Sequence, residues 1–401
     1  MKTALLLIVA AAVGFAVGSL IISKREASKH AAALAQERAV WNTEKAALEQ
    51  ELEAARARAA SLASAPLPVP APAAAAPTRL GPAEILSKLQ TLRGGSPRQL
   101  REAVYWLGEL AQHGPSSLPH IREFLARNQD IDLDTVTFTQ NKLLREVPLE
   151  FALPPSLRFG LFDVVRQIGS TDAERILAEA LARTGRGVEI VYLTRALQEV
   201  APNKYRDSAL SVARELLAAT TNPAFTSPLD RNHRENLFSV LALYNDTSFT
   251  ANAQAQLVQA DGQIDRGALK YLQQVLGAQS VAVAAQAYQD PRVSDSAKKE
   301  PLARLALTYV GGDQQANEFY QRAINDPVLT PNHRKNLIED LNEDGLNFKN
   351  LTTQDLPLIK NRLALIDQLA PSAMDKANAA AFQEARKDLV NMIGRLEPQP
   401  R

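Results

Sequence analysis

An apolar residue recurs at every third or fourth position over most of the stretch from Leu80 to Glu397. This spacing places apolar side chains on one face of an α-helix, whereas a half-buried strand would alternate apolar and polar residues. No convincing alternating segment interrupts the pattern. The sequence therefore predicts an all-α fold of about a dozen helices, mostly about ten to fifteen residues long. The clearest runs are Leu100, Val104, Leu107 and Leu110, then Leu157, Leu161, Val164 and Ile168, then Leu356, Ile359, Leu363 and Ile366.

Local signals mark where several of these helices begin. Ser96-Pro97 and Thr330-Pro331 each place a hydroxyl that can cap a helix before a proline suited to its first turn. Thr171 and Glu174 have the spacing of a capping box. Helix starts are therefore expected at these three places.

One segment contains all the features of a helical pair in order. Arg158 lies early in a first helix, Ile168-Gly169 ends it, a short polar turn follows, and a second apolar run begins at Ile176. Weaker copies surround three other glycines, Gly114, Gly277 and Gly311. Gly169, Gly277 and Gly311 are separated by 108 and 34 residues, close to three repeats and one repeat of about 36 residues.

This order of features resembles the HEAT-like repeat family, and the resemblance covers most of Leu80 to Ile324. It implies a curved α-solenoid whose surface binds another protein. Some relatives in the bilin-lyase-like subgroup are enzymes, so the resemblance leaves catalysis open. We assign residues 79–349 to the repeat domain and residues 350–398 to a C-terminal helical cap, because the open end of a solenoid core must be shielded.

The N-terminal part has a different composition. Ala4 to Ile22 contain no charge, which is long enough for one membrane-spanning helix. Residues 1–25 are therefore predicted to be an uncleaved signal-anchor, with a signal peptide cleaved near Ala16 as the alternative. Basic residues after the run favour a cytoplasmic body, but a short leader with a lysine also starts exported chains. The sequence predicts a single-pass membrane protein and leaves the side of the body open.

A stalk and a linker follow the apolar run. Residues 26–63 lack Pro and Gly and predict one long helix. Leucine, tryptophan or alanine recurs there every seventh residue, as in a coiled coil, although a single solvated helix remains the alternative. Residues 64–78 are a Pro-Ala tract that predicts an extended spacer. A parallel homodimer would use small residues in the apolar run and the heptad positions of the stalk: Gly14, Gly18, Leu34, Trp41, Leu48 and Leu62.

Composition restricts the chemistry that the chain can perform. There are 45 basic and 44 acidic residues, a net charge of +1, so bulk charge gives no nucleic-acid-binding face. Cysteine is absent, which excludes disulfides, thiolate nucleophiles and cysteine-based metal sites. The five histidines include no pair at the spacing of a helical zinc site, and nucleophile-elbow and phosphate-loop motifs are missing. We predict no enzyme, cofactor or metal site, although distant residues could still assemble an acid–base pair.

Two polar features interrupt the helical pattern and are candidate partner contacts. The non-periodic insertion 128–155 carries Asp130, Asp132 and Asp134 at alternate positions. A calcium loop would need Gly and Glu where Thr135 and Asn141 stand, so a solvated loop that contacts a partner is the preferred interpretation.

The second feature is a repeated hexapeptide, residues 232–237 and 332–337. Its two copies contain His233-Arg234 and His333-Arg334. They could form a paired polar site on the concave face. The alternative is a pair of helix starts in which Asn caps the helix while His and Arg are solvated. Acidic runs such as Glu339-Asp340 are typical of a solvated helical face.

Together these features predict a membrane-tethered helical-repeat scaffold that holds an unidentified protein partner. The linker would set its reach, and dimerisation would add avidity. The alternatives are a membrane-bound or exported enzyme on a helical-repeat scaffold, and a passive spacer.

Overall fold

The computed structural model describes residue 50 and residues 79–397, apart from 93, 134–148, 150–152, 220–226, 343, 347–349 and 374. The predicted anchor 1–25, the stalk 26–63 except residue 50, and the linker 64–78 lie outside the described residues. So does the predicted dimer face: Gly14, Gly18, Leu34, Trp41, Leu48 and Leu62. Within the described residues, no helix has both the length and the apolar character that a membrane crossing requires.

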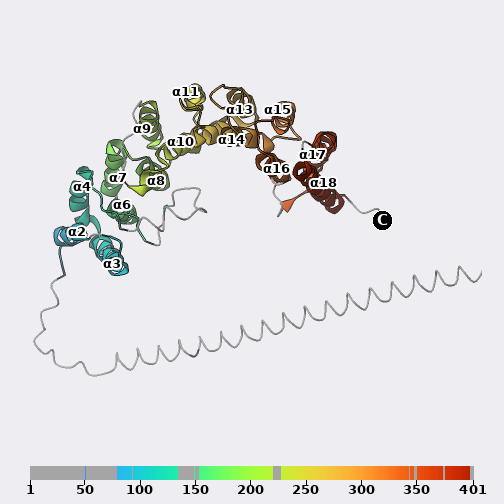
Figure 1. Ribbon diagram of the computed structural model, residues 1–401. Helices are drawn as coiled ribbons and strands as arrows, with labels where there is room; N and C mark the ends of the chain where they lie inside the picture. The colour runs from blue at the N-terminus through green and yellow to red at the C-terminus, as the bar shows by residue number, and fades with distance from the viewer. Residues whose placement is uncertain are drawn as a thin grey trace, which may run out of the picture. The chain divides into compact units, whose positions relative to one another are not determined.

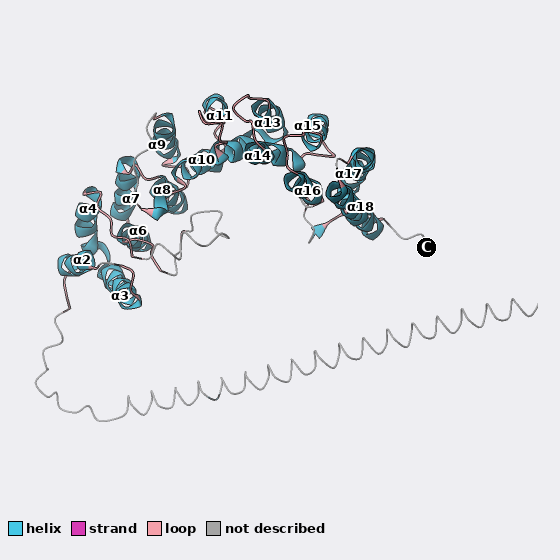
Figure 2. Ribbon diagram, viewed as in Figure 1, coloured by secondary structure: helices cyan, strands magenta, loops and turns pink. Residues whose placement is uncertain are grey.

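The chain divides into two compact units, Met1–Arg79 and Leu80–Arg401, and the second contains the described fold. Its described residues form α-helices, short 3-10 helices and turns, without a β-strand (Figure 2). Only two isolated bridges occur there, Asp132 with Ser156 and Val258 with Ile264. The predicted all-α class is confirmed for this part of the chain.

The helices of this unit form two rows (Figure 1). The inner row contains α3 (Pro97–His113), α6 (Leu157–Ile168), α8 (Gly187–Val200), α10 (His233–Leu243), α12 (Arg266–Leu276), α14 (Ser296–Leu307), α16 (Pro331–Asp340) and α18 (Lys376–Leu396). The outer row contains α4 (Leu118–Ala126), α7 (Thr171–Arg183), α9 (Arg206–Ala218), α11 (Thr250–Gln256), α13 (Ser280–Tyr288), α15 (Gln314–Ile324) and α17 (Leu356–Leu369), while α2 (Pro82–Thr91) packs against α3 and α4.

The turns between paired helices agree with the predicted number of helical pairs. Gly169, Gly277 and Gly311 each have a positive φ, which a residue without Cβ adopts without strain. Between the first two of these glycines, Asn203 (φ 62°) and Asn245 (φ 49°) stand in the α8–α9 and α10–α11 turns. The 108-residue interval therefore holds three helical pairs, as expected, but asparagine replaces glycine in two turns. Asparagine is among the few other residues that visit this conformation readily.

The expected helix starts are largely correct. Ser96 Oγ accepts a hydrogen bond from Gln99 N, and Thr330 Oγ1 accepts one from His333 N, each at 3.3 Å. The prediction for α7 is wrong by one residue, because Ser170 rather than Thr171 caps it through Ala173 N. Ser170 follows Gly169 directly, so one turn ends a helix and starts the next.

The apolar faces of the two rows enclose one continuous core that extends from Ile85 in α2 to Met392 in α18. Each helix pair buries its apolar surface against its neighbours, which is how helical repeats are stabilised. The predicted two helices at the C-terminal end are present as α17 and α18. They pack on each other, and α18 also packs on α16.

One buried arginine joins this last pair to the repeats. Arg362 of α17 is fully buried, and its guanidinium donates to Val310 O (2.9 Å), Leu341 O (2.5 Å) and Leu307 O (2.9 Å). These carbonyls lie at the ends of α14 and α16, where carbonyl groups lack partners within the helix. Burial lowers the pKa of Arg362 to about 10, so the side chain stays charged at neutral pH.

Candidate functional site

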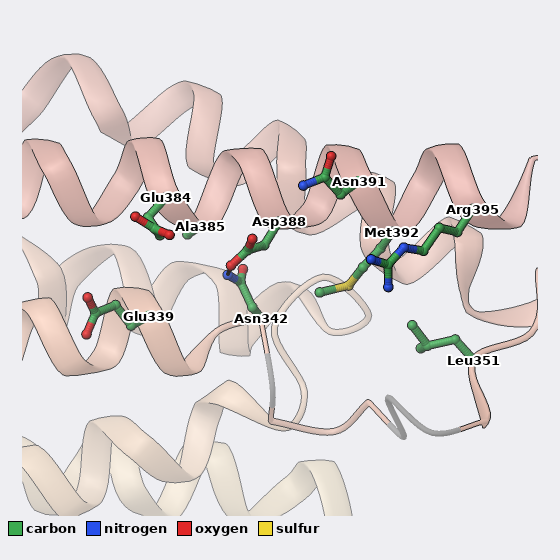
Figure 3. Close-up of a pocket in the computed structure, with 9 residues that line it drawn as sticks. All are labelled: Glu339, Asn342, Leu351, Glu384, Ala385, Asp388, Asn391, Met392 and Arg395. Carbon is green, nitrogen blue, oxygen red and sulfur yellow. Dashed lines mark hydrogen bonds between the residues drawn. The ribbon is translucent and has the colours of Figure 1, made fainter.

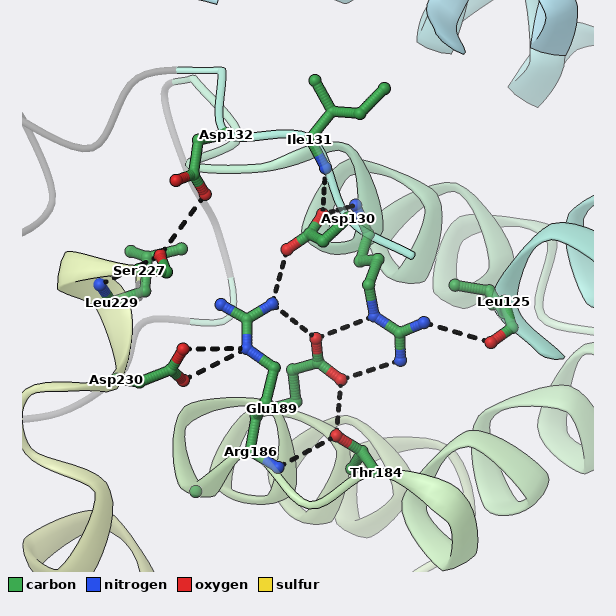
Figure 4. A network of polar contacts seen from close by, with 12 residues as sticks. Leu125, Asp130, Ile131, Asp132, Thr184, Arg186, Glu189, Ser227, Leu229 and Asp230 are labelled. Carbon is green, nitrogen blue, oxygen red and sulfur yellow. Dashed lines mark hydrogen bonds and ion pairs between the residues drawn. The ribbon is translucent and has the colours of Figure 1, made fainter. Parts of the chain in front are cut away.

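A buried polar network lies at the N-terminal ends of α6 and α8 (Figure 4). Its centre is the pair of Arg158 in α6 and Glu189 in α8. The guanidinium makes two hydrogen bonds of 2.8 Å to the carboxylate, and it donates a third to Leu125 O. Thr184 Oγ1 donates to the same carboxylate at 2.7 Å. The network thus ties three helices, α4, α6 and α8, to one another.

Arg186 extends this network at the turn before α8. Its guanidinium contacts Glu189, Asp130 and Asp230, the last of these in the 3-10 helix η2 (Pro228–Asp230). Burial lowers the pKa of Arg186, but hydrogen bonds to Asp230 and the neighbouring carboxylates outweigh it and raise the pKa above its ordinary value. Burial raises the pKa of Asp230, and the Arg186 guanidinium opposes that shift.

The structure gives the predicted aspartates different surroundings. Asp130 Oδ1 accepts hydrogen bonds from Ile131 N and Arg158 N, while its other oxygen faces Arg186. Asp130 therefore has an internal role, and its contact with a partner stays a prediction. Asp132 is more exposed and accepts a 3.4 Å bond from Ser227 Oγ; burial and the charge of Asp130 raise its pKa. Asp134 lies outside the described residues.

The repeated hexapeptide marks helix starts, because α10 begins at His233 and α16 begins at Pro331. The expectation that the histidines and arginines are solvated is wrong for His233 and Arg334, which are each 6% exposed. In neither copy does an asparagine side chain cap the helix. Asn232 makes no such bond, and Thr330 caps α16. Stacking of neighbouring repeats buries these starts, which a single helix pattern does not show.

Each histidine contacts the start of the preceding inner helix. His233 Nδ1 accepts a 3.0 Å hydrogen bond from Gly187 N, the first residue of α8. His333 Nδ1 shares a 2.6 Å hydrogen bond with Ser296 Oγ, the first residue of α14. The two copies thus hold different helix pairs together, α8 with α10 and α14 with α16.

The Ser296–His333 contact has the residue types of a nucleophile and its base, but its geometry fits a structural bond. Ser296 is only 8% exposed, and its Oγ also accepts from Thr330 N at 2.8 Å. His233 makes the corresponding contact with a backbone N–H, where no nucleophile exists. The role that both copies share is therefore to join repeats.

The arginines of the hexapeptides also bind neighbouring segments. Arg234 donates to Asp265 Oδ2 at 2.7 Å, and Asp265 in turn caps α12 through Ala268 N. Arg334 donates to Asp326 O at 3.1 Å. Both copies thus contribute to repeat stacking.

A pocket of about 450 Å³ lies between α16 and α18 (Figure 3). Three carboxylates, Ala385 and the amide of Asn342 line one part of it, and Asn391, Met392, Leu351 and Arg395 line the other. The lining residues are Glu339, Asn342, Leu351, Glu384, Ala385, Asp388, Asn391, Met392 and Arg395. Sequence reasoning placed Glu339 on a solvated helical face and did not find the pocket, because it forms only when α18 packs against α16.

Several exposed apolar side chains lie on helices of the inner row. Among the described residues, four of the six large hydrophobic side chains that are exposed lie on inner helices: Val104 and Tyr105 on α3, Leu243 on α10 and Val390 on α18. Tyr105 is the most exposed of them, at 58%. Apolar groups of this kind supply contacts in protein interfaces.

No protein-family model, curated protein or solved structure matches this chain. In the described parts of the chain, no group of three or more His, Asp or Glu side chains could hold a metal ion. Function is therefore inferred from the repeat architecture and from the surfaces described above.

Proposed function

We propose that the chain is a membrane-tethered scaffold of HEAT-like helical repeats that holds a protein partner. The observation that carries this proposal is the inner row of helices, which presents Tyr105, Leu243 and Val390 to solvent over an extended series of stacked repeats. Stacked repeats of this kind create long surfaces suited to binding other proteins.

The N-terminal sequence supports the tether. Ala4 to Ile22 are free of charge, and the following helix-forming and Pro-Ala segments would separate the repeats from the membrane. A parallel dimer through Leu34, Trp41 and Leu48 would present two partner surfaces at once and raise avidity.

Site-specific photocrosslinking tests the scaffold. The full-length chain would carry a photoreactive phenylalanine analogue at Tyr105 or Val390 on the inner row, or at Glu215 or Glu318, which are exposed on outer helices. We expect discrete adducts with a second protein from the inner positions only, identified by mass spectrometry from the native cell. Adducts from neither row, or equally from both, would contradict an inner binding surface.

Membrane extraction tests the tether separately. We expect the full-length chain to remain in the membrane pellet after alkaline carbonate washing, and a variant lacking residues 1–25 to be released. Protease digestion of a C-terminal epitope before and after membrane lysis then shows on which side the repeats lie. Release of the full-length chain by carbonate would contradict an anchor.

A further inference from the structure

We infer that the pocket between α16 and α18 binds one alkylammonium group, the side chain of a lysine on the partner protein. The inference rests on the proposed function for the source of that lysine. The chemistry of the pocket itself follows from four features of its lining.

The first feature is negative charge at one end. Glu339 of α16 and Glu384 and Asp388 of α18 line this part of the pocket (Figure 3). Glu339 is paired with Lys335 of its own helix at 2.9 Å, so Glu384 and Asp388 carry most of the attraction for a cation. Two helices therefore bring carboxylates to one small volume.

The second feature is a buried oxygen that needs a donor. Asn342 is only 6% exposed, and its Oδ1 has no hydrogen-bond partner among the described residues. Its Nδ2 donates to Asp388 Oδ2 at 3.4 Å, and Figure 3 shows the amide directed toward this carboxylate. Buried polar groups normally have a partner. A primary ammonium has three donors and could bind Asp388 and Glu384 together; Asn342 Oδ1, which is itself closed to solvent, becomes a third acceptor only when the amide turns toward the pocket.

The third feature is an apolar wall beside the charged end. Ala385 lines the pocket beside Glu384, and Met392 and Leu351 line it further along, toward Arg395 (Figure 3). Such a wall suits the methylene stem of a lysine, which buries along apolar surface while its charged head reaches polar groups. A bare metal ion would gain nothing from this wall.

The fourth feature limits the ligand to a single positive charge. Arg395 lies on the same face of α18 as Asp388, two helical turns and about 10 Å further along at 1.5 Å per residue. Its guanidinium would repel a second ammonium and attract a backbone carbonyl or a carboxylate. A lysine within a polypeptide presents that combination, whereas a free diamine does not.

Methyl NMR on the full-length protein in detergent micelles tests the pocket directly. The chain has three methionines, so labelling their methyl groups with carbon-13 gives three signals, and the one lost in Met392→Leu belongs to the pocket. The probe is n-butylammonium, an analogue of the lysine side chain, and 1-butanol is its uncharged control. We expect a saturating shift of the Met392 signal with n-butylammonium alone. No shift, or the same shift with 1-butanol, would overturn the inference.

Variants separate the pocket from general charge effects. Replacing both Glu384→Gln and Asp388→Asn should weaken n-butylammonium binding by about tenfold or more. Asn342→Leu should also weaken it while keeping a side chain of similar size. Asp207→Asn, an exposed carboxylate on α9, is the control and should leave the binding curve unchanged. Equal weakening by the control would overturn the assignment.

A last comparison distinguishes the source of the cation. N-acetyl-lysine methylamide should bind at least as tightly as n-butylammonium, and 1,5-diaminopentane should not bind more tightly. A clear preference for the diamine would show that the pocket selects a free diamine rather than a protein lysine, and it would overturn the inference. Crosslinks from Tyr105 without a Met392 response would reject the pocket alone, whereas a Met392 response without crosslinks would reject the scaffold.

Discussion

Arg158 and Glu189 form a two-pronged ion pair in which both N–O distances are 2.8 Å and the side chains are 3% and 0% exposed. A guanidinium and a carboxylate match each other in this planar arrangement. Because neither charge can reach water, each depends on the other. The same shielding makes the pair a sensitive point of the repeat stack.

Arg158→Met should destabilise the protein by about 3–5 kcal/mol, because it leaves the carboxylate of Glu189 buried with fewer donors. The double variant Arg158→Met with Glu189→Leu should lose less unfolding free energy than the sum of the losses in the two single variants. Urea unfolding followed by circular dichroism measures both. Arg122→Met breaks the more exposed pair with Glu179 and should cost about 1 kcal/mol or less. Additive single losses would refute the coupling.

Arg362→Met should loosen the C-terminal helices, since three carbonyls at the ends of α14 and α16 lose their buried donor. We expect the local stability of these helices to fall by a free energy on the order of 3 kcal/mol. Hydrogen exchange should rise in α17 and α18 but stay unchanged in α6 and α8, because repeats interact mainly with their neighbours. Arg386→Met removes an exposed pair with Asp367 and is the matched control. Uniform exchange along the unit would contradict this role.

His233 should make stability depend on pH. Burial, and then the charge of Arg234, lower its folded-state pKa below the ordinary value of 6.5. The unfolded chain therefore binds more protons, so this contribution is complete above about pH 6.5 and is lost as the pH falls below it. Each pKa unit of lowering corresponds to about 1.4 kcal/mol. The unfolding free energies of wild type and His233→Gln should converge as the pH falls from about 7.5 to 5.5, measured at intervals of about 0.5 pH units. Curves that stay parallel would disprove the effect.

Gly169 should tolerate asparagine better than alanine. Its φ of 63° and ψ of 18° are left-handed, and an ordinary residue pays about 1–2 kcal/mol there. Asn203 and Asn245 adopt similar φ values in the α8–α9 and α10–α11 turns. Gly169→Asn should therefore lower the stability clearly less than Gly169→Ala. Thermal unfolding of the two variants provides the comparison. Equal losses would show that space at the turn, rather than φ, restricts this position.

Helix content and repeat period were predictable because both depend on residues that are near one another in sequence. The run from Leu157 to Ile168 forms α6, and Gly169 ends it in the expected left-handed conformation. The Asn203 and Asn245 turns were missed, since asparagine is also a common cap or surface residue and carries no unique signal. The all-α class followed from the spacing alone.

The polar contacts could not be predicted in the same way. Sequence reasoning recognised Arg158 as a repeat feature but not Glu189 as its partner, which lies 31 residues away. It treated His233 as solvated, although α8 covers it through Gly187. The pocket at Asn342 and Asp388 likewise joins residues 46 positions apart.

The sequence by itself determined the helical class and several of the turns, because each depends on side chains within a few residues of one another. Only the tertiary structure decided which charges are buried, which histidines join repeats and where a pocket opens. Those properties depend on how one helix pair is rotated and spaced against the next, and a periodic apolar pattern is compatible with many such arrangements.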